Sequence, residues 1–329
     1  MSELTTTYRI VTNAYDPTRT LTLRNAFVRG VNRRFRDLIA VIRRTIVDLD
    51  SFGLQTTVYQ SPLTPPPGRE LFSFPRIANK VGAFMRWLQT QEEKGLLEIV
   101  QYNRIGEAGE QPWTNVYIRD SYKRGVMRAR YELHKAGYNV PTIEASGGIE
   151  AVLGTPFHID RVGMAYTRAF NELKGITSAM DTQISRILAQ GLIDGDNPNL
   201  LARKIVATIN GSGMGELGIT DSLGRFIPAQ RRAQTMARTE IIRAHHLANI
   251  GEYKNWGAEG VEIFAEWRTA GDDRVCTECA GYDGNKYTLE AAEHAIPVHP
   301  NCRCVALPIS RSRLPEGSVI HEQFVRTGV

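Results

Sequence analysis

All four cysteines of this 329-residue chain lie between Cys276 and Cys304, in the strings C-T-E-C and H-P-N-C-R-C. Cysteine and histidine supply the ligands of zinc sites, and a tetrahedral zinc ion requires four of them. The candidate ligands are Cys276, Cys279, His299, Cys302 and Cys304. Their spacing predicts two short loops that hold a structural zinc ion with four of these five residues. The sequence leaves open which one is spare, and Cys302 and Cys304 are the natural competitors.

Disulfides, buried free cysteines and a redox C-x-x-C motif are the alternatives to a metal site. The start of the chain, MSELTTTYRIV, has no basic stretch before an apolar core, so we expect no signal peptide and a reducing cytoplasm, where disulfides are rare. No βαβ pattern surrounds the C-x-x-C, which disfavours a redox site. Neither H-E-x-x-H nor a deaminase signature occurs, and thiolates alone can fill the metal shell. We therefore expect a structural metal and not a catalytic one.

The composition is that of an ordinary globular protein, with 42% hydrophobic and 23% charged residues. Its length predicts two or three domains. No uninterrupted apolar run approaches the roughly eighteen residues that a membrane span requires, so we expect no membrane partner. The net charge of +5 is carried largely by arginine. Such a charge permits contact with nucleic acid or with an acidic protein surface.

Residues 16 to about 50 are predicted to form one long amphipathic helix, with Asp16 as its N-cap and Pro17 at the first helical position. Its apolar stripe consists of Phe27, Val31, Phe35, Leu38, Ile42, Ile46 and Leu49. The opposite face carries Arg29, Arg33, Arg36 and Arg43, and a second basic group, in residues 113–136, includes Arg124 and Arg128. Solvated or salt-bridged side chains are the simple interpretation of both groups, and contact with DNA or an acidic protein is the alternative.

The rest of the chain reads as helices followed by a small module with strands. Helices are expected at about 75–101, 113–136, 155–173, 176–190 and 198–209, and from Pro228 for roughly 25 residues. Alternating residues then predict a strand that ends at Trp267 and pairs with a strand through Val305, Leu307 and Ile309. Gly213-x-Gly215-x-x-Gly218 spells a dinucleotide-binding pattern, but no strand precedes it, so we reject that interpretation.

We therefore predict a mainly α fold with a small C-terminal α+β module, in which short antiparallel strands surround a zinc-knuckle-like site. Long helices occupy the first two thirds of the chain. The predicted segments are a long helix at 1–50, a Pro-rich linker at 51–72, a helical region at 73–150, a domain at 151–310 with the zinc site at 267–308, and a tail at 311–329.

Three strings carry a family resemblance: A-R-T-E-I-I-R-A, then W-R-T-A-G-D-D-R-V-C-T-E-C, then H-P-N-C-R-C-V-A-L-P. In this order they resemble the C-terminal domain of the Mu F-like minor head proteins of tailed bacteriophages, also called phage head morphogenesis proteins. The resemblance covers about residues 155–310 and is strongest over 236–308. Its motif residues in this chain are Arg238, Thr239, Glu240, Trp267, Asp273 and Arg303.

The resemblance implies a non-enzymatic minor capsid protein, assembled in the host cytoplasm and located inside the virion head at the portal vertex. It would act in head assembly, DNA packaging or DNA ejection. The implied partners are the portal protein and, beyond it, the major capsid or scaffold protein and double-stranded DNA bound without sequence preference. Two alternatives stay open: a nucleic-acid-binding zinc module that reads base edges, and a metal-dependent nuclease or hydrolase that uses Asp272, Asp273 or Glu240.

Overall fold

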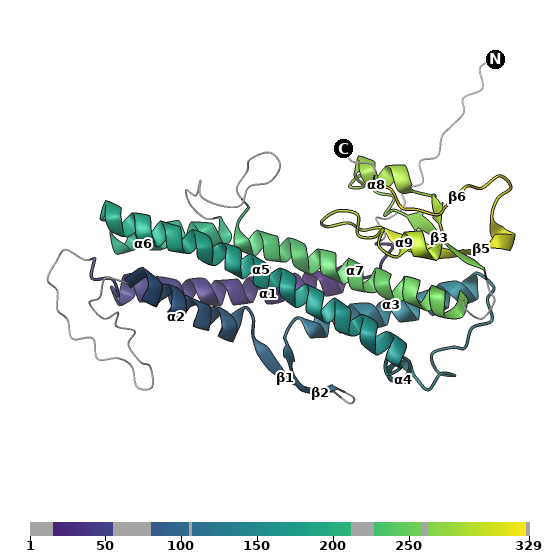
Figure 1. Ribbon diagram of the computed structural model, residues 1–329, viewed down its shortest axis with the longest axis horizontal. Coiled ribbons are helices and arrows are strands. Elements are labelled where there is room, and N and C mark those ends of the chain that lie inside the picture. Colours follow the sequence, from purple (N-terminus) through teal and green to yellow (C-terminus); the bar gives the residue numbers. More distant parts are fainter. Residues whose placement is uncertain (1–15, 55–79, 105–106, 212–226, 258–261, 327–329) are drawn as a thin grey trace, which may run out of the picture. The chain divides into compact units, whose positions relative to one another are not determined.

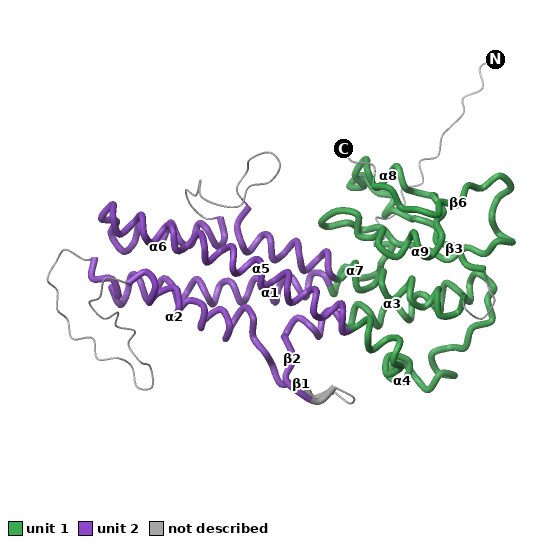
Figure 2. The backbone as a smooth tube through the Cα atoms, in the orientation of Figure 1, with its two compact units in different colours: residues 1–23, 119–162, 241–329 green, residues 24–118, 163–240 purple. Residues whose placement is uncertain are grey.

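The protein is described by a computed structural model that covers residues 16–54, 80–104, 107–211, 227–257 and 262–326 (Figure 1). It is about 63% helical, which confirms the mainly α fold with small sheets of short strands. Contacts divide the chain into two units, shown in Figure 2. Unit 1 comprises Met1–Leu23, Arg119–Val162 and Ile241–Val329, and unit 2 comprises Arg24–Ile118 and Gly163–Glu240. The five predicted segments stay a prediction, and most of the Pro-rich linker and the Gly213 loop lie outside the described residues.

Unit 2 is built from helices and one hairpin. Its elements are most of α1 (Leu21–Arg43) with the π-helical turn η1 (Arg44–Asp48), α2 (Lys80–Gly95), the strands β1 (Ile99–Arg104) and β2 (Glu107–Pro112), most of α5 (Pro156–Asp194), α6 (Pro198–Asn210) and the first part of α7 (Ala229–Gly257). None of the helices within the described residues is long and apolar enough to cross a membrane.

The predicted apolar stripe is buried from Phe27 to Ile46, whereas Leu49 is half-buried. The α-helix itself ends at Arg43, earlier than predicted, and continues as the π-helical turn η1. The start of the helix was predicted too early. The Asp16 carboxylate accepts from the backbone N–H groups of Thr18 and Thr20, at 3.2 and 3.1 Å, and so closes a turn before the helix. An Asx-type turn of this kind competes with helical hydrogen bonding, and α1 begins only at Leu21.

Two other helix predictions were wrong in their boundaries. The helix expected at 75–101 ends at Gly95, and Ile99 and Val100 pair instead with Pro112 and Gln111 in an antiparallel hairpin. The helices expected at 155–173 and 176–190 are one helix, α5. A glycine costs a helix only about 1 kcal/mol, and the buried residues on both sides of Gly175 keep the helical period. The predicted α6 is confirmed, with Asn197 accepting from the Leu200 N–H as its N-cap.

Unit 2 also contains a buried carboxyl pair that the sequence did not indicate. Glu92 on α2 is only 3% exposed. Burial first, and then the charge of Asp181 on α5, raise the pKa of Glu92 to about 10. The folded protein therefore holds a proton on this pair at neutral pH, and unfolding releases it.

Replacing Glu92 with glutamine is expected to remove a pH dependence of stability. Because the folded pKa lies above the unfolded value of about 4.5, the wild-type protein loses stability as the pH rises, by at most about 1.4 kcal/mol per pH unit. Between pH 6 and 8 this amounts to roughly 2–3 kcal/mol. Urea unfolding at several pH values measures this loss of stability. If the free energy of unfolding depends on pH in the same way for the wild type and for Glu92→Gln, the pair does not share a proton.

Unit 1 combines helices with a four-stranded sheet. Its helices are most of α3 (Asn115–Lys135), the short α4 (Ile149–Leu153), α8 (Thr277–Tyr282) and α9 (Leu289–Ala292), with the second part of α7. The sheet has the strand order β5-β3-β4-β6, formed by Val305–Ser310, Ile263–Arg268, Lys286–Tyr287 and Ile320–His321. The predicted antiparallel pairing of β3 with β5 is confirmed, whereas β4 and β6 are parallel.

The predicted tail at 311–329 is partly built into this sheet. Residues 320 and 321 form β6, and the Phe324 ring stacks on Trp267 with centroids 5.8 Å apart and an interplanar angle of 7°. Tyr282 and Tyr287 contact the same two rings. A stacked aromatic pair contributes about 0.5–1.5 kcal/mol beyond its burial, which explains why this segment packs against the module.

Helices α3 and α7 make a close contact within unit 1 at Gly125. A Cβ added there would lie 2.5 Å from the His245 carbonyl oxygen and 2.6 Å from the Ala248 Cβ. Replacing Gly125 with alanine therefore forces two backbones apart, and we expect it to lower the free energy of unfolding by about 1–3 kcal/mol.

The matched control for Gly125 is Gly163→Ala, in the helix α5, where the added Cβ meets nothing within 4 Å. There the higher helix propensity of alanine should raise stability by up to about 1 kcal/mol. Chemical unfolding of both variants measures the difference, and equal effects would refute the close approach.

Candidate metal centre

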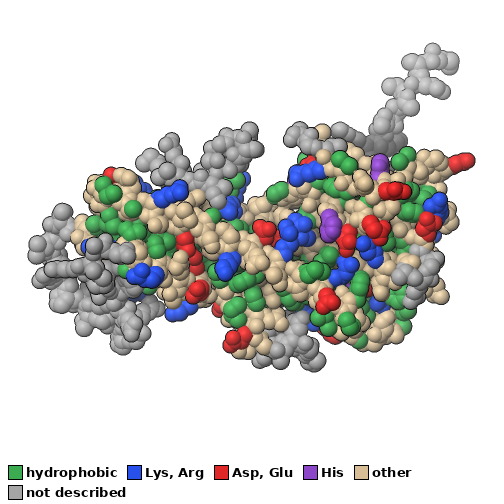
Figure 3. All heavy atoms as spheres, in the orientation of Figure 1, with side chains coloured by type: hydrophobic (Ala, Val, Ile, Leu, Met, Phe, Trp, Pro, Cys, Tyr) green, Lys and Arg blue, Asp and Glu red, His purple; other side chains and the backbone are tan. Residues whose placement is uncertain are grey.

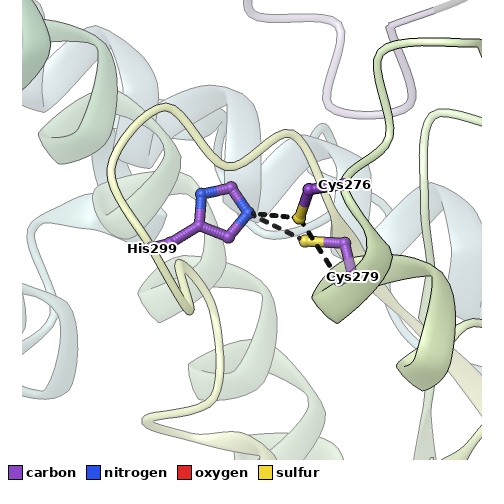
Figure 4. Close-up of side chains that lie close together, drawn as sticks. All are labelled: Cys276, Cys279 and His299. Carbon is purple, nitrogen blue, oxygen red and sulfur yellow. Dashed lines mark hydrogen bonds between the residues drawn. The ribbon is translucent and has the colours of Figure 1, made fainter. Parts of the chain in front are cut away.

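The two predicted loops meet in unit 1 where β3 ends and the neighbouring strand β5 begins. Cys276 is the N-cap of α8 and Cys279 lies in its first turn, so both sulfurs face the same side, and the Cys276 sulfur accepts from the Cys279 N–H at 3.4 Å. Cys302 and Cys304 lie in the loop that leads into β5, and His299 comes just before them. Figure 4 shows the His299 ring directed at the Cys276 and Cys279 sulfurs from the opposite loop.

The five candidate ligands form two overlapping groups. The His299 Nε2 lies 3.2 Å from the Cys276 sulfur and 3.0 Å from the Cys279 sulfur. Cys279 also joins Cys302 and Cys304, with 4.0 Å between the Cys279 and Cys302 sulfurs. Within each group all ligand atoms lie within 4.8 Å of one another. Cys279 is therefore the residue common to both groups.

These distances fit a tetrahedral ion bound by sulfur and nitrogen. With Zn–S near 2.3 Å and Zn–N near 2.0 Å, ligand atoms of one tetrahedron lie roughly 3.5–3.8 Å apart. The observed separations of 3.0, 3.2 and 4.0 Å lie within about half an ångström of these values, and the four cysteines are free thiols and not cystines. The cluster can therefore hold a metal ion.

The three buried thiols alter one another's pKa values in opposite directions. Cys279, Cys302 and Cys304 are each at most 3% exposed. Hydrogen bonds from the Cys279 and Cys304 thiols hold the pKa of Cys302 well below its usual range, while the hydrogen bond to Cys302 raises the pKa of Cys279. A divalent cation would offset the repulsion between neighbouring thiolates and favour release of the thiol protons.

His299 is oriented by its own loop. The Nδ1–H donates to the Pro300 carbonyl at 2.8 Å, which leaves the Nε2 lone pair directed at the sulfurs. A backbone partner on the distal nitrogen is the usual device that fixes the tautomer of a metal-binding histidine.

An ion pair joins the two loops beside the cluster. Both Arg303 side-chain NH groups donate to the Asp272 carboxylate at 2.6 Å, and Arg274 binds the same carboxylate at 2.8 Å. The hydrogen bonds from Arg303 hold the pKa of Asp272 well below its usual range. Asp272 precedes the first cysteine pair and Arg303 lies between Cys302 and Cys304, so this bidentate contact fixes one loop against the other.

Asp272→Asn is expected to weaken Zn²⁺ binding by about 10- to 100-fold, because residues that orient metal ligands contribute to affinity on this scale. Competition with a chromophoric chelator measures the affinity. The control is Asp273→Asn, which changes the neighbouring exposed carboxylate and should bind zinc like the wild type. Equal losses in both variants would point to charge near the site and not to the ion pair.

The family-motif residues are distributed over both units. Glu240 is 4% exposed and lies 3.5 Å from Arg168 within unit 2, and the Thr239 hydroxyl donates to the Thr235 carbonyl. In unit 1, Trp267 lies in the core beside the cluster, and Arg303 pairs with Asp272. Arg238 is half-buried and Asp273 is exposed. The structural role predicted for Arg238 and Asp273 stays a prediction.

The predicted contact arginines differ in their surroundings. Arg124 and Arg128 donate to the carbonyls of Arg19 and Pro17, and Arg128 also pairs with Glu132 at 2.6 Å. Arg29, Arg33, Arg36 and Arg43 are exposed on α1. Figure 3 shows basic and acidic side chains interspersed over the face in view, so the net positive charge is not gathered there. Contact of these arginines with DNA or a partner stays a prediction.

Sequence reasoning did not predict that Asp272 joins the two loops or that Phe324 packs in the module. Asp272 was named only as a candidate of the hydrolase alternative, with no signal that distinguished it from Asp273. The aromatic residue in the otherwise polar string H-E-Q-F-V-R was the available signal for Phe324.

These features define a mainly helical protein whose C-terminal α+β module gathers four cysteines and a histidine at a zinc-knuckle-like site. Residues 182–307 match the family model described as Phage Mu protein F like protein, a range that includes the whole cluster. This match confirms the predicted resemblance to the Mu F-like phage head morphogenesis proteins over that part of the chain. No curated protein and no solved structure matches the chain significantly.

Proposed function

We propose that this chain is a minor capsid protein that resides inside the phage head at the portal vertex and acts in head assembly, DNA packaging or DNA ejection. The observation that carries the proposal is the family match over residues 182–307. The family is one of structural head proteins. The portal protein is the proposed principal partner, with the major capsid or scaffold protein as a further one.

The proposal assigns the metal cluster an architectural role, with zinc as the ion. Four of the five residues Cys276, Cys279, His299, Cys302 and Cys304 would hold it. Bound zinc would cross-link the α8 loop to the loop before β5, while the burial of three thiols restricts access by a substrate. A catalytic zinc site keeps an open position for water, and thiolates that can complete the shell favour a structural site.

The hydrolase alternative has little support in the contacts of its residues. Asp272 is engaged by two arginines, and Glu240 is buried and pairs with Arg168. Glu240 also belongs to unit 2, whereas Asp272 belongs to unit 1.

Quantitative mass spectrometry of purified virions tests the proposed location. We expect the chain in few copies per particle, in constant ratio to the portal protein, and retained in heads emptied of DNA or released with it. Co-expression with the portal protein should yield a complex that survives gel filtration. Absence from virions, together with no portal complex, would refute the proposed function whatever the metal content of the chain.

A further inference from the structure

A groove in unit 2 carries three arginines of α1 that the metal cluster does not use. It encloses about 750 Å³ and is lined by Arg29, Arg33 and Arg36, together with Asn32, Tyr117 and Gln230. The three arginines are exposed, and none of them forms an ion pair or side-chain hydrogen bond within the described residues. Among the described residues, no carboxylate lines the groove. Three guanidinium groups thus line one groove, and no acidic side chain among the described lining residues neutralises their charge.

The polar side chains between the arginines present hydrogen-bond donors. The Asn32 Oδ1 accepts from the Gln230 Nε2 at 2.9 Å and from the Gln234 Nε2 at 2.7 Å. This occupies the acceptor of Asn32, while its own amide N–H groups stay available. Guanidinium and amide N–H groups together select an anion and disfavour a cation.

The spacing of the three arginines suits a polymer that carries regularly spaced anionic groups. Arg29, Arg33 and Arg36 stand at positions i, i+4 and i+7 of one helix, so they span about 10 Å along its axis. A nucleic-acid strand presents one phosphate per nucleotide, each about 3.4 Å further along the duplex axis, so long side chains spread over about 10 Å of an α-helix can reach neighbouring phosphates of one duplex. Arginine binds phosphate oxygens through two parallel N–H groups, which suits such a ladder.

The groove lacks what a protein or a single strand would need. Protein interfaces are anchored by apolar and aromatic side chains in pockets, and here the apolar surface is limited to Ala26 and the Tyr117 ring. Single strands bind by stacking bases on aromatic faces. The Tyr117 ring is stacked on Phe27, with centroids 4.6 Å apart, and meets the edge of Trp113.

We propose that this α1 groove binds the phosphate backbone of double-stranded nucleic acid without reading its sequence. Arg29, Arg33 and Arg36 each contact a phosphate, and Asn32 donates an additional hydrogen bond. This binding site is inferred from the residues of the groove and not from the family match or the metal cluster. A failure to bind duplexes would therefore leave the proposed location in the head and the metal site unaffected.

The test measures binding of two unrelated short DNA duplexes to the full chain by fluorescence anisotropy over a range of salt concentrations. In the variant Arg29→Gln/Arg33→Gln/Arg36→Gln we expect at least about tenfold weaker binding at low salt. The slope of log K against log salt should fall by about 2.7, or 0.9 for each lost phosphate contact. The single variant Arg33→Gln should lower the slope by about 0.9, and it replaces the triple variant if that one fails to fold.

The matched control removes the same charge elsewhere in unit 2. Arg86, Arg186 and Arg203 are exposed and do not line this groove. Their triple change to glutamine should leave the salt slope within about one unit of the wild type. Equal losses in both triple variants, affinities that differ between the two duplexes, or no duplex binding would each overturn the proposal. The proposal would also be overturned if binding of a polyglutamate peptide required the three arginines while binding of the duplex did not.

Discussion

Replacing Cys279 with serine is expected to lower the melting temperature of the metal-bound protein by roughly 10–20 °C. Cys279 belongs to both ligand groups, so its sulfur lies within 4.8 Å of the ligand atoms of all four other candidates. Zinc-finger peptides gain about 10–16 kcal/mol from a structural zinc ion. Losing even a third of that shifts the melting temperature by this amount in a protein of this size, at about 2–4 °C per kcal/mol.

A chelator supplies the internal control for this prediction. It should lower the melting temperature of the wild type to near that of Cys279→Ser and should leave the variant almost unchanged. Zinc analysis should give one ion per wild-type chain. Fluorescence of Trp267, which packs within the module, reports whether the loss is local. If the chelator leaves the melting temperature of the wild type unchanged, the thiols do not hold a stabilising ion.

The local features of this chain were predictable because they depend on spacing. A period of 3.6 residues places Phe27, Phe35 and Ile42 on one face of α1, whatever the rest of the chain does. The C-x-x-C string likewise places Cys276 and Cys279 at the start of one short helix. The ligand candidates could be named from the sequence for the same reason, before their distances were known.

The contacts between distant segments were not predictable from spacing. The choice of Asp272 over its neighbour Asp273 depends on an arginine 31 positions away. The hairpin at Ile99–Pro112 follows a helix of similar composition, and only the pairing of its strands distinguishes it. The segment at 320–326 was predicted as a tail because its packing depends on Trp267, more than fifty residues earlier.

The clearest case of a non-local feature is a buried polar network around Glu252 in unit 1. The His158 Nε2–H donates to the Glu252 carboxylate at 2.9 Å, while the His158 Nδ1 accepts from the Tyr122 hydroxyl. Arg130 and Trp256 donate to the second carboxylate oxygen at 3.0 and 2.8 Å. The network joins α3, α5 and α7 within the unit.

Burial acts to raise the pKa of Glu252, but hydrogen bonds from His158 and Trp256 and the charge of Arg130 outweigh it, and the pKa lies below its ordinary value. A depressed folded pKa stabilises the protein above the unfolded pKa of about 4.5, and this contribution is lost as the pH falls through the folded value. Glu252→Gln is therefore expected to cost about 3–5 kcal/mol at neutral pH, because it leaves the buried Arg130 without its counter-charge. The difference from the wild type should shrink in acid.

Two comparisons distinguish this mechanism from a general loss of packing. Glu262→Gln removes the partner of Arg311 from an ion pair in which both side chains are more than half exposed, so it should cost less than about 1 kcal/mol. The double variant Arg130→Met/Glu252→Gln should be more stable than the sum of its single changes predicts, since it removes the uncompensated charge. Urea unfolding at neutral and acid pH is measured for the wild type, the single variants Glu252→Gln, Arg130→Met and Glu262→Gln, and the double variant. Additive effects in the double variant would show that Arg130 and Glu252 do not act as a pair, and the cost of losing Glu252 would then reflect its other hydrogen bonds.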